Sequence, residues 1–149
     1  MNWSTPDDYT DVFEHLQRAE VQYVVVSGVA VVLHGHLRSI ADLDIVISSQ
    51  PEEADRAMHA LLLAGFAPSI PLPLSLVSVM RMFDSEEREV DVFVRYYVPF
   101  NELWEASEQV RVGEQLARVI SLSHLIRVKQ TLARPHDLED VEHLLALAS

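Results

Sequence analysis

Asp42 and Asp44 stand two residues apart at the start of an apolar run, Leu43 to Ile47. Because successive side chains of a strand alternate between its faces, both carboxylates are expected to point to the same face. Two like charges side by side in a buried strand are costly unless a cation lies between them. Taken alone, such a pair more often marks a strand end that emerges into water, so a metal site needs further support.

A third acid supplies that support. Asp91 lies between valines in the segment Glu89 to Val94, where an ionised side chain needs a partner. Taken alone, it is equally compatible with an edge strand whose solvent face carries Glu89, Asp91 and Arg95. Three carboxylates on neighbouring strands, however, suit Mg²⁺, which completes its shell with water and phosphate oxygens. Two such ions would stabilise both the attacking and the leaving oxygens of a phosphoryl displacement.

The pair Ser27-Gly28 lies between a β-rich run, Val21 to Val26, and an expected helix from Val29 to His34. A glycine there lets the backbone approach a phosphate closely, and a helix start offers free N–H groups. Ser27 would add a hydroxyl donor. A plain strand-to-helix turn has the same sequence, so the value of the pair lies in its place 14 residues before Asp42.

Short turns join the elements that must position these residues, as in a single domain over residues 1–149. Periodicity and caps predict strands over 21–26, 42–47, 74–83 and 88–96, with a small hairpin over 109–120. Helices are expected over 5–19, 29–34, 51–64, 99–106, 121–133 and 137–148, and the prolines at 68, 71 and 73 forbid regular structure. The fold class expected is α+β of the α/β type, a mixed sheet flanked by helices.

Four segments, in this order along the chain, resemble the nucleotidyltransferase superfamily that includes DNA polymerase β-like enzymes. They are Tyr23 to Ala30, His34 to Arg38, Ala41 to Asp44 with the later acid Asp91, and the C-terminal stretches 125–129 and 134–141. More narrowly, the segments are similar to small bacterial proteins related to the AbiEii-type toxin nucleotidyltransferases. The resemblance covers about residues 21–145 and implies a minimal nucleotidyltransferase fold with C-terminal helices.

The resemblance implies a reaction and roles for residues. A nucleoside monophosphate would pass from an NTP, such as ATP, to an acceptor hydroxyl on an RNA such as tRNA, on a protein or on a small molecule. Asp42 and Asp44 would bind two Mg²⁺ ions, and Asp91 would complete the catalytic metal and help deprotonate the acceptor. The family has Gly at the first position of the Gly-Gly or Gly-Ser pair, where this chain has Ser27, which predicts a tighter or differently shaped phosphate loop. That departure keeps an alternative open, a catalytically inactive binding or regulatory protein of this fold, for instance in a toxin–antitoxin pair.

Two basic residues complete the predicted nucleotide site, beside Ser27 and Gly28. Lys129 is the only lysine and lies on the apolar stripe of its helix, where its stem packs and its ammonium either snorkels into solvent or reaches the cleft. The resemblance favours the cleft, with the ammonium resting against the three acids and Asp137 as a further candidate partner. Arg38, four residues before Asp42, would bind phosphate or base, or pair with Asp42. His34 and His36 lack a third nitrogen ligand and are interpreted as helix-end and loop residues.

Composition limits the partners. The chain has 149 residues, no cysteine, and 11 basic against 23 acidic residues, for a net charge of −12. Such a chain repels nucleic acid as a whole, although a local basic patch remains compatible with binding. The absence of cysteine and of an apolar run of membrane length fits a cytoplasmic protein without a membrane partner. The sequence leaves open whether the chain forms a homo-oligomer or binds a cognate partner protein. The apolar segment 68–79 is interpreted as the start of a buried strand rather than as an edge of the acceptor site or a subunit contact.

Overall fold

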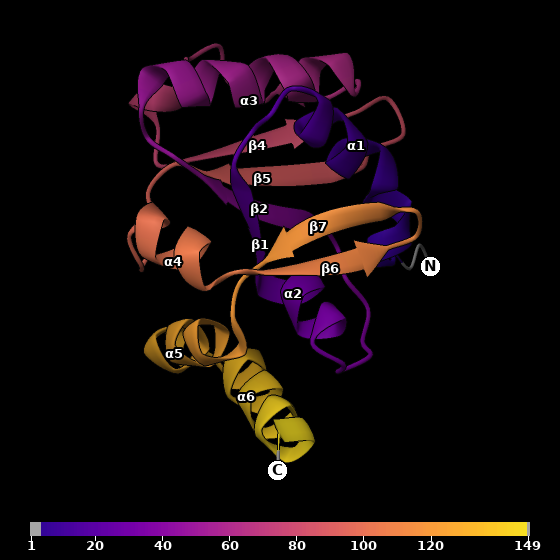
Figure 1. Cartoon of the computed structure of the whole chain (residues 1–149), viewed down its shortest axis with the longest axis vertical. Coiled ribbons are helices and arrows are strands. Elements are labelled where there is room, and N and C mark those ends of the chain that lie inside the picture. Colours follow the sequence, from indigo (N-terminus) through magenta and orange to yellow (C-terminus); the bar gives the residue numbers. More distant parts are fainter. Residues whose placement is uncertain (1–3, 149) are drawn as a thin grey trace.

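A computed structural model describes residues 4–148, so residues 1–3 and 149 of the predicted domain lie outside the described residues. Seven strands form one sheet in the order β3-β4-β5-β2-β1-β7-β6 (Figure 1). The strands are β1 (Tyr23–Val26), β2 (Leu43–Ile47), β3 (Ala67–Pro68), β4 (Val79–Phe83), β5 (Glu89–Phe93), β6 (Glu108–Val112) and β7 (Gln115–Val119). The helices are α1 (Thr10–Arg18), α2 (Ser27–Leu33), α3 (Pro51–Leu63), α4 (Phe100–Ala106), α5 (Leu122–Leu132) and α6 (Pro135–Ala148), with 3₁₀ turns η1 (Pro6–Tyr9) and η2 (Leu74–Leu76).

The sheet is mixed, which confirms the expected fold class. β2 lies between β1, to which it runs antiparallel, and β5, to which it runs parallel. β4 is antiparallel to β5, and β7 is parallel to β1. In this register Asp44 lies opposite Asp91, and Asp91 lies opposite Arg81 of β4. The pairing of β2 with β5 therefore brings together acids that are 47 residues apart in the chain.

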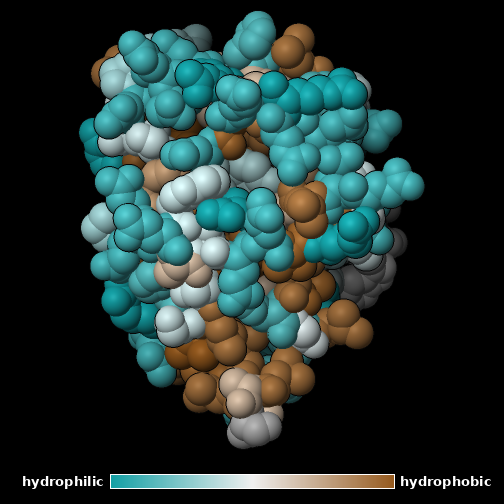
Figure 2. Space-filling view, viewed as in Figure 1, coloured by the Kyte–Doolittle hydropathy of each residue, from teal (hydrophilic) through white to brown (hydrophobic). Residues whose placement is uncertain are grey.

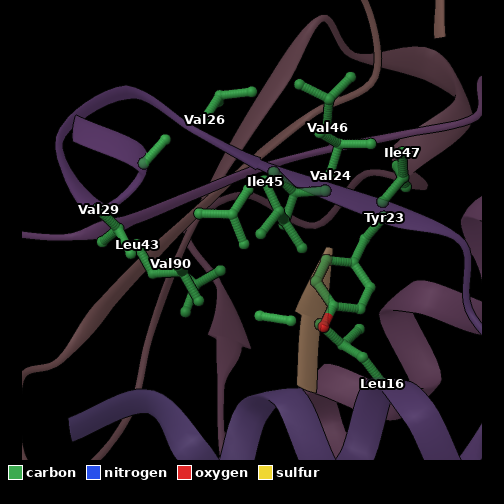
Figure 3. Packing of buried hydrophobic residues seen from close by; sticks show 14 of the residues in the cluster. Leu16, Tyr23, Val24, Val26, Val29, Leu43, Ile45, Val46, Ile47 and Val90 are labelled. Atoms are coloured by element: carbon green, nitrogen blue, oxygen red, sulfur yellow. The ribbon is translucent and has the colours of Figure 1, made fainter. Parts of the chain in front are cut away.

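Helices bury the central strands. α1 and α3 pack against each other and contact β7 and β2, whereas α2 and α4 contact β1. The Phe13 ring of α1 stacks on the Tyr23 ring of β1 with 6.1 Å between centroids. Figure 3 shows the close packing of Leu43 and Ile45 of β2 with Val90 of β5 and the valines of β1. This rigid core fixes the positions of the strand ends that carry the acids.

The C-terminal helices form a separate arm at one end of the molecule (Figure 1). The Ser121 side chain caps α5 by accepting from the His124 N–H, and Ala133 ends it in a left-handed conformation with φ 51°. The chain then turns back into α6, which packs on α5. In Figure 2 the apolar surface gathers at this end, where Leu138, Leu145 and Leu147 of α6 are exposed. Within residues 4–148, no helix combines the length and apolarity needed to cross a membrane.

Several boundaries differ from the expected ones. The first helix divides into η1 and α1, and α2 starts at Ser27 rather than at residue 29. The predicted strand over 74–83 is wrong in its first half, where η2 precedes β4. Ile70, Leu72 and Leu76 are exposed, so the segment before β4 is not the start of a buried strand. Pro68 nevertheless pairs with Met82, because an edge position tolerates a missing N–H donor.

Candidate functional site

The three aspartates converge on one point. Asp44 and Asp91 are register partners on parallel strands, and Asp42 precedes β2 by one residue. One carboxylate oxygen from each of the three lies within 4.8 Å of the other two. Asp91 is 8% exposed, and its Oδ1 atom is buried without a hydrogen-bond partner among the residues that the structure describes. A buried, unpartnered carboxylate oxygen beside two other carboxylates fits a divalent cation with oxygen ligands.

The electrostatics agree with that fit. Burial raises the pKa of Asp44 well above its usual range, the Asp42 charge raises it further, and Ser27 opposes the shift by hydrogen bonding. Burial also raises the pKa of Asp91, with contributions from Glu89 and from Asp44. The pKa of Asp42 moves in the same direction through burial and Glu89. Without a cation, the folded protein therefore holds these like charges at a cost.

Glu89 is a fourth acid at this cluster that the sequence analysis assigned only to a possible solvent face. It lies two residues before Asp91 and raises the pKa of Asp42 as well as that of Asp91. The spacing of Glu89 and Asp91 repeats that of Asp42 and Asp44, and this repeated spacing is the signal that could have identified it. Glu89 is half-buried, so it borders the three aspartates and is less enclosed than Asp91.

Ser27 and Gly28 form the first turn of α2, beside the acids. Ser27 has a φ of 58°, a left-handed conformation that glycine adopts more readily than serine. The serine therefore takes the strained backbone shape itself, and its hydroxyl interacts with Asp44. A Cβ atom added at Gly28 would lie 3.2 Å from the Arg38 Nη2 atom, so the absence of a side chain leaves room for that guanidinium.

Two adjoining pockets meet at the acids. The Gly28 pocket is lined by six of the seven predicted site residues, which are Ser27, Gly28, Arg38, Asp42, Asp44 and Lys129. The Asp91 pocket shares Ser27, Asp42 and Asp44 with it and adds Asp91 together with residues of β4 and β5. Asp42 and Asp44 thus lie between the two pockets, and Asp91 belongs to the second one only.

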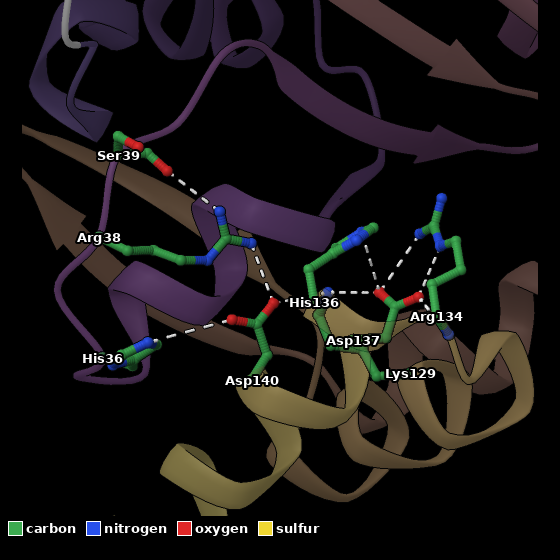
Figure 4. A network of polar contacts seen from close by, with 8 residues as sticks. All are labelled: His36, Arg38, Ser39, Lys129, Arg134, His136, Asp137 and Asp140. Atoms are coloured by element: carbon green, nitrogen blue, oxygen red, sulfur yellow. Dashed lines mark hydrogen bonds and ion pairs between the residues drawn. The ribbon is translucent and has the colours of Figure 1, made fainter.

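The Lys129 ammonium neither extends into solvent nor contacts the three aspartates. Its side chain is 5% exposed, so it does not snorkel into solvent. Its Nζ atom also does not rest against the three acids: it lies 3.1 Å from Asp137 Oδ1 and 3.0 Å from Asp140 Oδ2 (Figure 4). The predicted partner Asp137 is correct, whereas Asp140 was not anticipated. A buried cation needs carboxylates nearby, and α6 supplies both of them one turn apart.

The same acids hold two arginines. Arg134 Nε donates to Asp137 Oδ2 over 2.6 Å, and Arg38 Nη2 donates to Asp140 Oδ2 over 3.0 Å (Figure 4). Burial alone would raise the pKa of Asp137, but hydrogen bonds from Arg134 and Lys129 outweigh it and lower the pKa to about 2. The expected alternative pairing of Arg38 with Asp42 is wrong, because Asp140 takes that place. The network ties the loop before β2 to the C-terminal arm.

The histidines lie where they were expected. His34 caps the end of α2, and its Nε2 atom is 2.7 Å from the Ile120 carbonyl. His36 follows in the loop, stacks on His143 of α6 with 4.1 Å between ring centroids, and lies 4.0 Å from Asp140 Oδ1. His34 thus joins the end of α2 to the segment after β7, and His36 joins the following loop to α6; both lie outside the three-aspartate cluster.

Neither the protein-family models nor the curated proteins gave a match to this sequence. Solved structures do match over nearly the whole chain. The lincosamide antibiotic adenylyltransferase LnuA with bound lincomycin is 15% identical with a TM-score of 0.73, covering 98% of this chain and 99% of that one. A putative nucleotidyltransferase from Thermotoga maritima is 14% identical with a TM-score of 0.67, covering 97% of each chain. ANT(2")-Ia in complex with adenylyl-2"-tobramycin is 10% identical with a TM-score of 0.70, covering 97% of this chain and 89% of that one. The chain therefore has the fold of the nucleotidyltransferases.

Proposed function

We propose that this chain is a nucleotidyltransferase that moves a nucleoside monophosphate from an NTP to an acceptor hydroxyl and releases pyrophosphate. The observation that carries the proposal is the cluster of Asp42, Asp44 and Asp91, whose carboxylates approach within 4.8 Å and include a buried, unpartnered oxygen. Such a cluster is costly unless a cation binds it, and a cation at a pocket floor suits phosphoryl chemistry. The fold shared with adenylyltransferases supports the same reaction class.

In this proposal Asp42, Asp44 and Asp91 hold Mg²⁺, two ions when NTP is bound. The ions would supply positive charge for the phosphate oxygens during transfer. Asp91 would accept the proton of the acceptor hydroxyl at a carboxylate oxygen, since it lines the pocket that the nucleotide leaves open.

The Gly28 pocket would hold the nucleotide. Ser27 and Gly28 would face the terminal phosphates, and Arg38 would neutralise part of their charge across the side-chain-free surface of Gly28. Lys129 donates to Asp137 Oδ1 and forms an ion pair with Asp140 Oδ2. Its ammonium has three N–H donors, so a further one would bind a phosphate oxygen while the two aspartates hold the ammonium in place.

An inactive protein of the same fold was the alternative that Ser27 kept open. The left-handed φ of Ser27 argues against it, because the serine holds the backbone shape that a glycine would take at this position. In this proposal the loop binds phosphate with Ser27 in that conformation. Four further statements remain proposals beside the main one: a toxin–antitoxin partner, a homo-oligomer, a cytoplasmic location and a single domain over residues 1–149.

The test measures transfer of a labelled nucleoside monophosphate from an NTP to an acceptor. The purified chain would be incubated with each α-labelled NTP, Mg²⁺ and a set of acceptors that includes tRNA, cell lysate protein and small-molecule extracts. We expect label in one acceptor class with the wild type and a loss of at least about a thousandfold in Asp44→Ala. Asp55→Ala removes an exposed acid from α3 and is the matched control. A wild type that neither binds an NTP nor transfers label would overturn the proposal.

A further inference from the structure

The Asp91 pocket has a chemical character of its own, and this inference about it rests on the proposed function. Asp42 and Asp44 line both pockets, whereas Gly28, Arg38 and Lys129 line only the first. A nucleotide held by the first group leaves the Asp91 pocket free. Since Asp91 lines only that pocket, an acceptor hydroxyl has to reach it from there.

Arginines gather at this pocket although the chain as a whole is strongly acidic. Arg81 of β4 lies opposite Asp91 in the sheet and lines the Asp91 pocket, as does Arg134. Arg95 lines an adjoining hollow that shares Val79 and the aromatic wall with it. Neither the Arg81 nor the Arg95 side chain makes an ion pair or a hydrogen bond with the residues from 4 to 148. A chain of net charge −12 thus leaves one unpaired cation in the pocket of the acids and a second in the adjoining hollow, as far as residues 4–148 show.

Arg81 has a balancing effect on the acids in the absence of metal. It lies opposite Asp91 in the strand register, yet no carboxylate of residues 4–148 lies within the 4.0 Å of an ion pair with it. Once a divalent cation neutralises the carboxylates, the positive charge of Arg81 no longer offsets their negative charge. The exposed guanidinium of Arg81 then adds to a positive region at the Asp91 pocket.

The walls of the pocket are aromatic and apolar. Phe93 and Tyr96 contact edge to face with 5.5 Å between centroids, and Tyr96 contacts Tyr97 at 5.1 Å. Tyr97 is 57% exposed and Val79 is 42% exposed, so both present apolar surface to a ligand. The Asp91 pocket measures about 360 Å³, which is the size of a small-molecule site. Exposed rings beside unpaired arginines suit a planar apolar group next to an anion.

We infer that the acceptor is a small hydroxyl compound that carries a carboxylate or phosphate next to a planar apolar part. Arg81 and Arg95 bind its anionic group, Tyr97 and Phe93 contact its apolar part, and its hydroxyl faces Asp91. A polyamine acceptor is disfavoured because three arginines border the pocket. A long polyanion such as RNA is disfavoured because the −12 net charge repels it beyond this small positive region.

The experiment measures binding by NMR titration in the presence of Mg²⁺ and a non-hydrolysable NTP analogue, chosen as the one of four bases that the chain binds. The probes are four benzyl alcohols that differ only in the para group: carboxylate, phosphate, carboxamide or aminomethyl. We expect the two anionic probes to bind at least about tenfold more tightly than the carboxamide, and the amine to bind most weakly. Arg81→Gln should remove most of the anionic preference and leave carboxamide binding unchanged. Arg111→Gln removes an exposed arginine from β6 at the far edge of the sheet. This control should change neither the anionic preference nor the binding of the carboxamide.

The outcomes separate the two proposals. Failure of the analogues of all four NTPs to bind counts against the proposed function. If an analogue binds, the inference is overturned by equal binding of the carboxamide or amine, by a preference that survives Arg81→Gln, or by no binding of the anionic probes. Tighter binding of a short RNA oligonucleotide that depends on Arg81 would likewise overturn the assignment to a small molecule. A preference for the phosphate over the carboxylate, or the reverse, identifies which anion the arginines accept.

Discussion

At the scale of single residues, Ser27 is one of four non-glycine residues with a positive φ in the part of the chain that the structure describes, and the one that lines the pocket of the aspartates. Its φ of 58° costs an L-residue on the order of 1 kcal/mol, since the Cβ atom crowds the neighbouring carbonyl. Non-glycine residues in this region concentrate at functional sites, where the surrounding structure maintains the strain. Here the strained residue joins β1 to α2 and places its hydroxyl beside Asp44. The strain thus accompanies a contact at the acids that a glycine could not make.

The strain at Ser27 predicts that a glycine substitution is more stable there than an alanine substitution, the reverse of the usual order in a helix. Ser27→Gly relieves the left-handed backbone and Ser27→Ala retains it, and both remove the hydroxyl. We expect Ser27→Gly to be about 1 kcal/mol more stable to urea than Ser27→Ala. At an ordinary exposed helix position alanine is more stabilising than glycine, and Asp55 of α3 provides that control. The free energy of unfolding of Asp55→Ala should exceed that of Asp55→Gly by about 1 kcal/mol. The same order at both positions would show that Ser27 is unstrained.

At the scale of elements, much of the architecture could be predicted because local patterns encode it. Caps and prolines located most helices, and Pro135 at the first position of α6 is a helix-start signal that the prediction of 137–148 passed over. The hairpin of β6 and β7 was predicted to within a residue or so because the turn at Gly113 is local. η2 escaped prediction because Leu74 and Leu76 continue an apolar run that looks like a strand.

Contacts between distant elements were harder to predict. The convergence of Asp44 and Asp91 followed from their shared need for a cation, which is a chemical argument that does not require the strand order. The partners of Lys129 could not be found in this way. Asp137 and Asp140 lie on a helix whose direction depends on the left-handed turn at Ala133, and nothing in the local sequence announces that turn.

The α5–α6 network makes Lys129 a structural residue as well as a candidate ligand of phosphate. Lys129→Met keeps the apolar packing of the stem but leaves Asp137 and Asp140 each with one cation fewer. We expect a loss of about 3 kcal/mol in the free energy of unfolding, measured by urea titration. NTP affinity should also fall by about ten- to a hundredfold, under conditions where the variant is fully folded.

A second variant separates the two effects. Adding Asp140→Asn to Lys129→Met removes one of the uncompensated carboxylates and should recover part of the lost stability while leaving NTP affinity low. Recovery of both properties would mean that Lys129 acts on the nucleotide only through the fold. Wild-type stability in Lys129→Met would contradict the buried ion pairs.

At the scale of the whole molecule, the net charge of −12 means that any added cation weakens repulsion within the folded chain. The three aspartates add a local repulsion that only a bound cation can remove, and their raised pKa values reflect it. Stabilisation by metal therefore has a general part, which ionic strength mimics, and a specific part, which depends on the cluster. The two parts can be separated by comparing salts and variants.

We expect Mg²⁺ to raise the melting temperature of the wild type beyond the effect of NaCl at the same ionic strength. A site with a dissociation constant near 1 mM would gain about 1.4 kcal/mol at 10 mM Mg²⁺ by mass action, or roughly 3–5 °C for a chain of this size. Asp44→Asn removes one like charge from the cluster, so it should be more stable than the wild type without metal, by on the order of 2 kcal/mol, and should lose the specific Mg²⁺ shift. Asp55→Asn, which removes an exposed acid, should keep the shift and change stability little. A wild-type shift that NaCl reproduces in full, or one that persists in Asp44→Asn, would mean that Mg²⁺ acts on the acidic surface and that the cluster does not hold it.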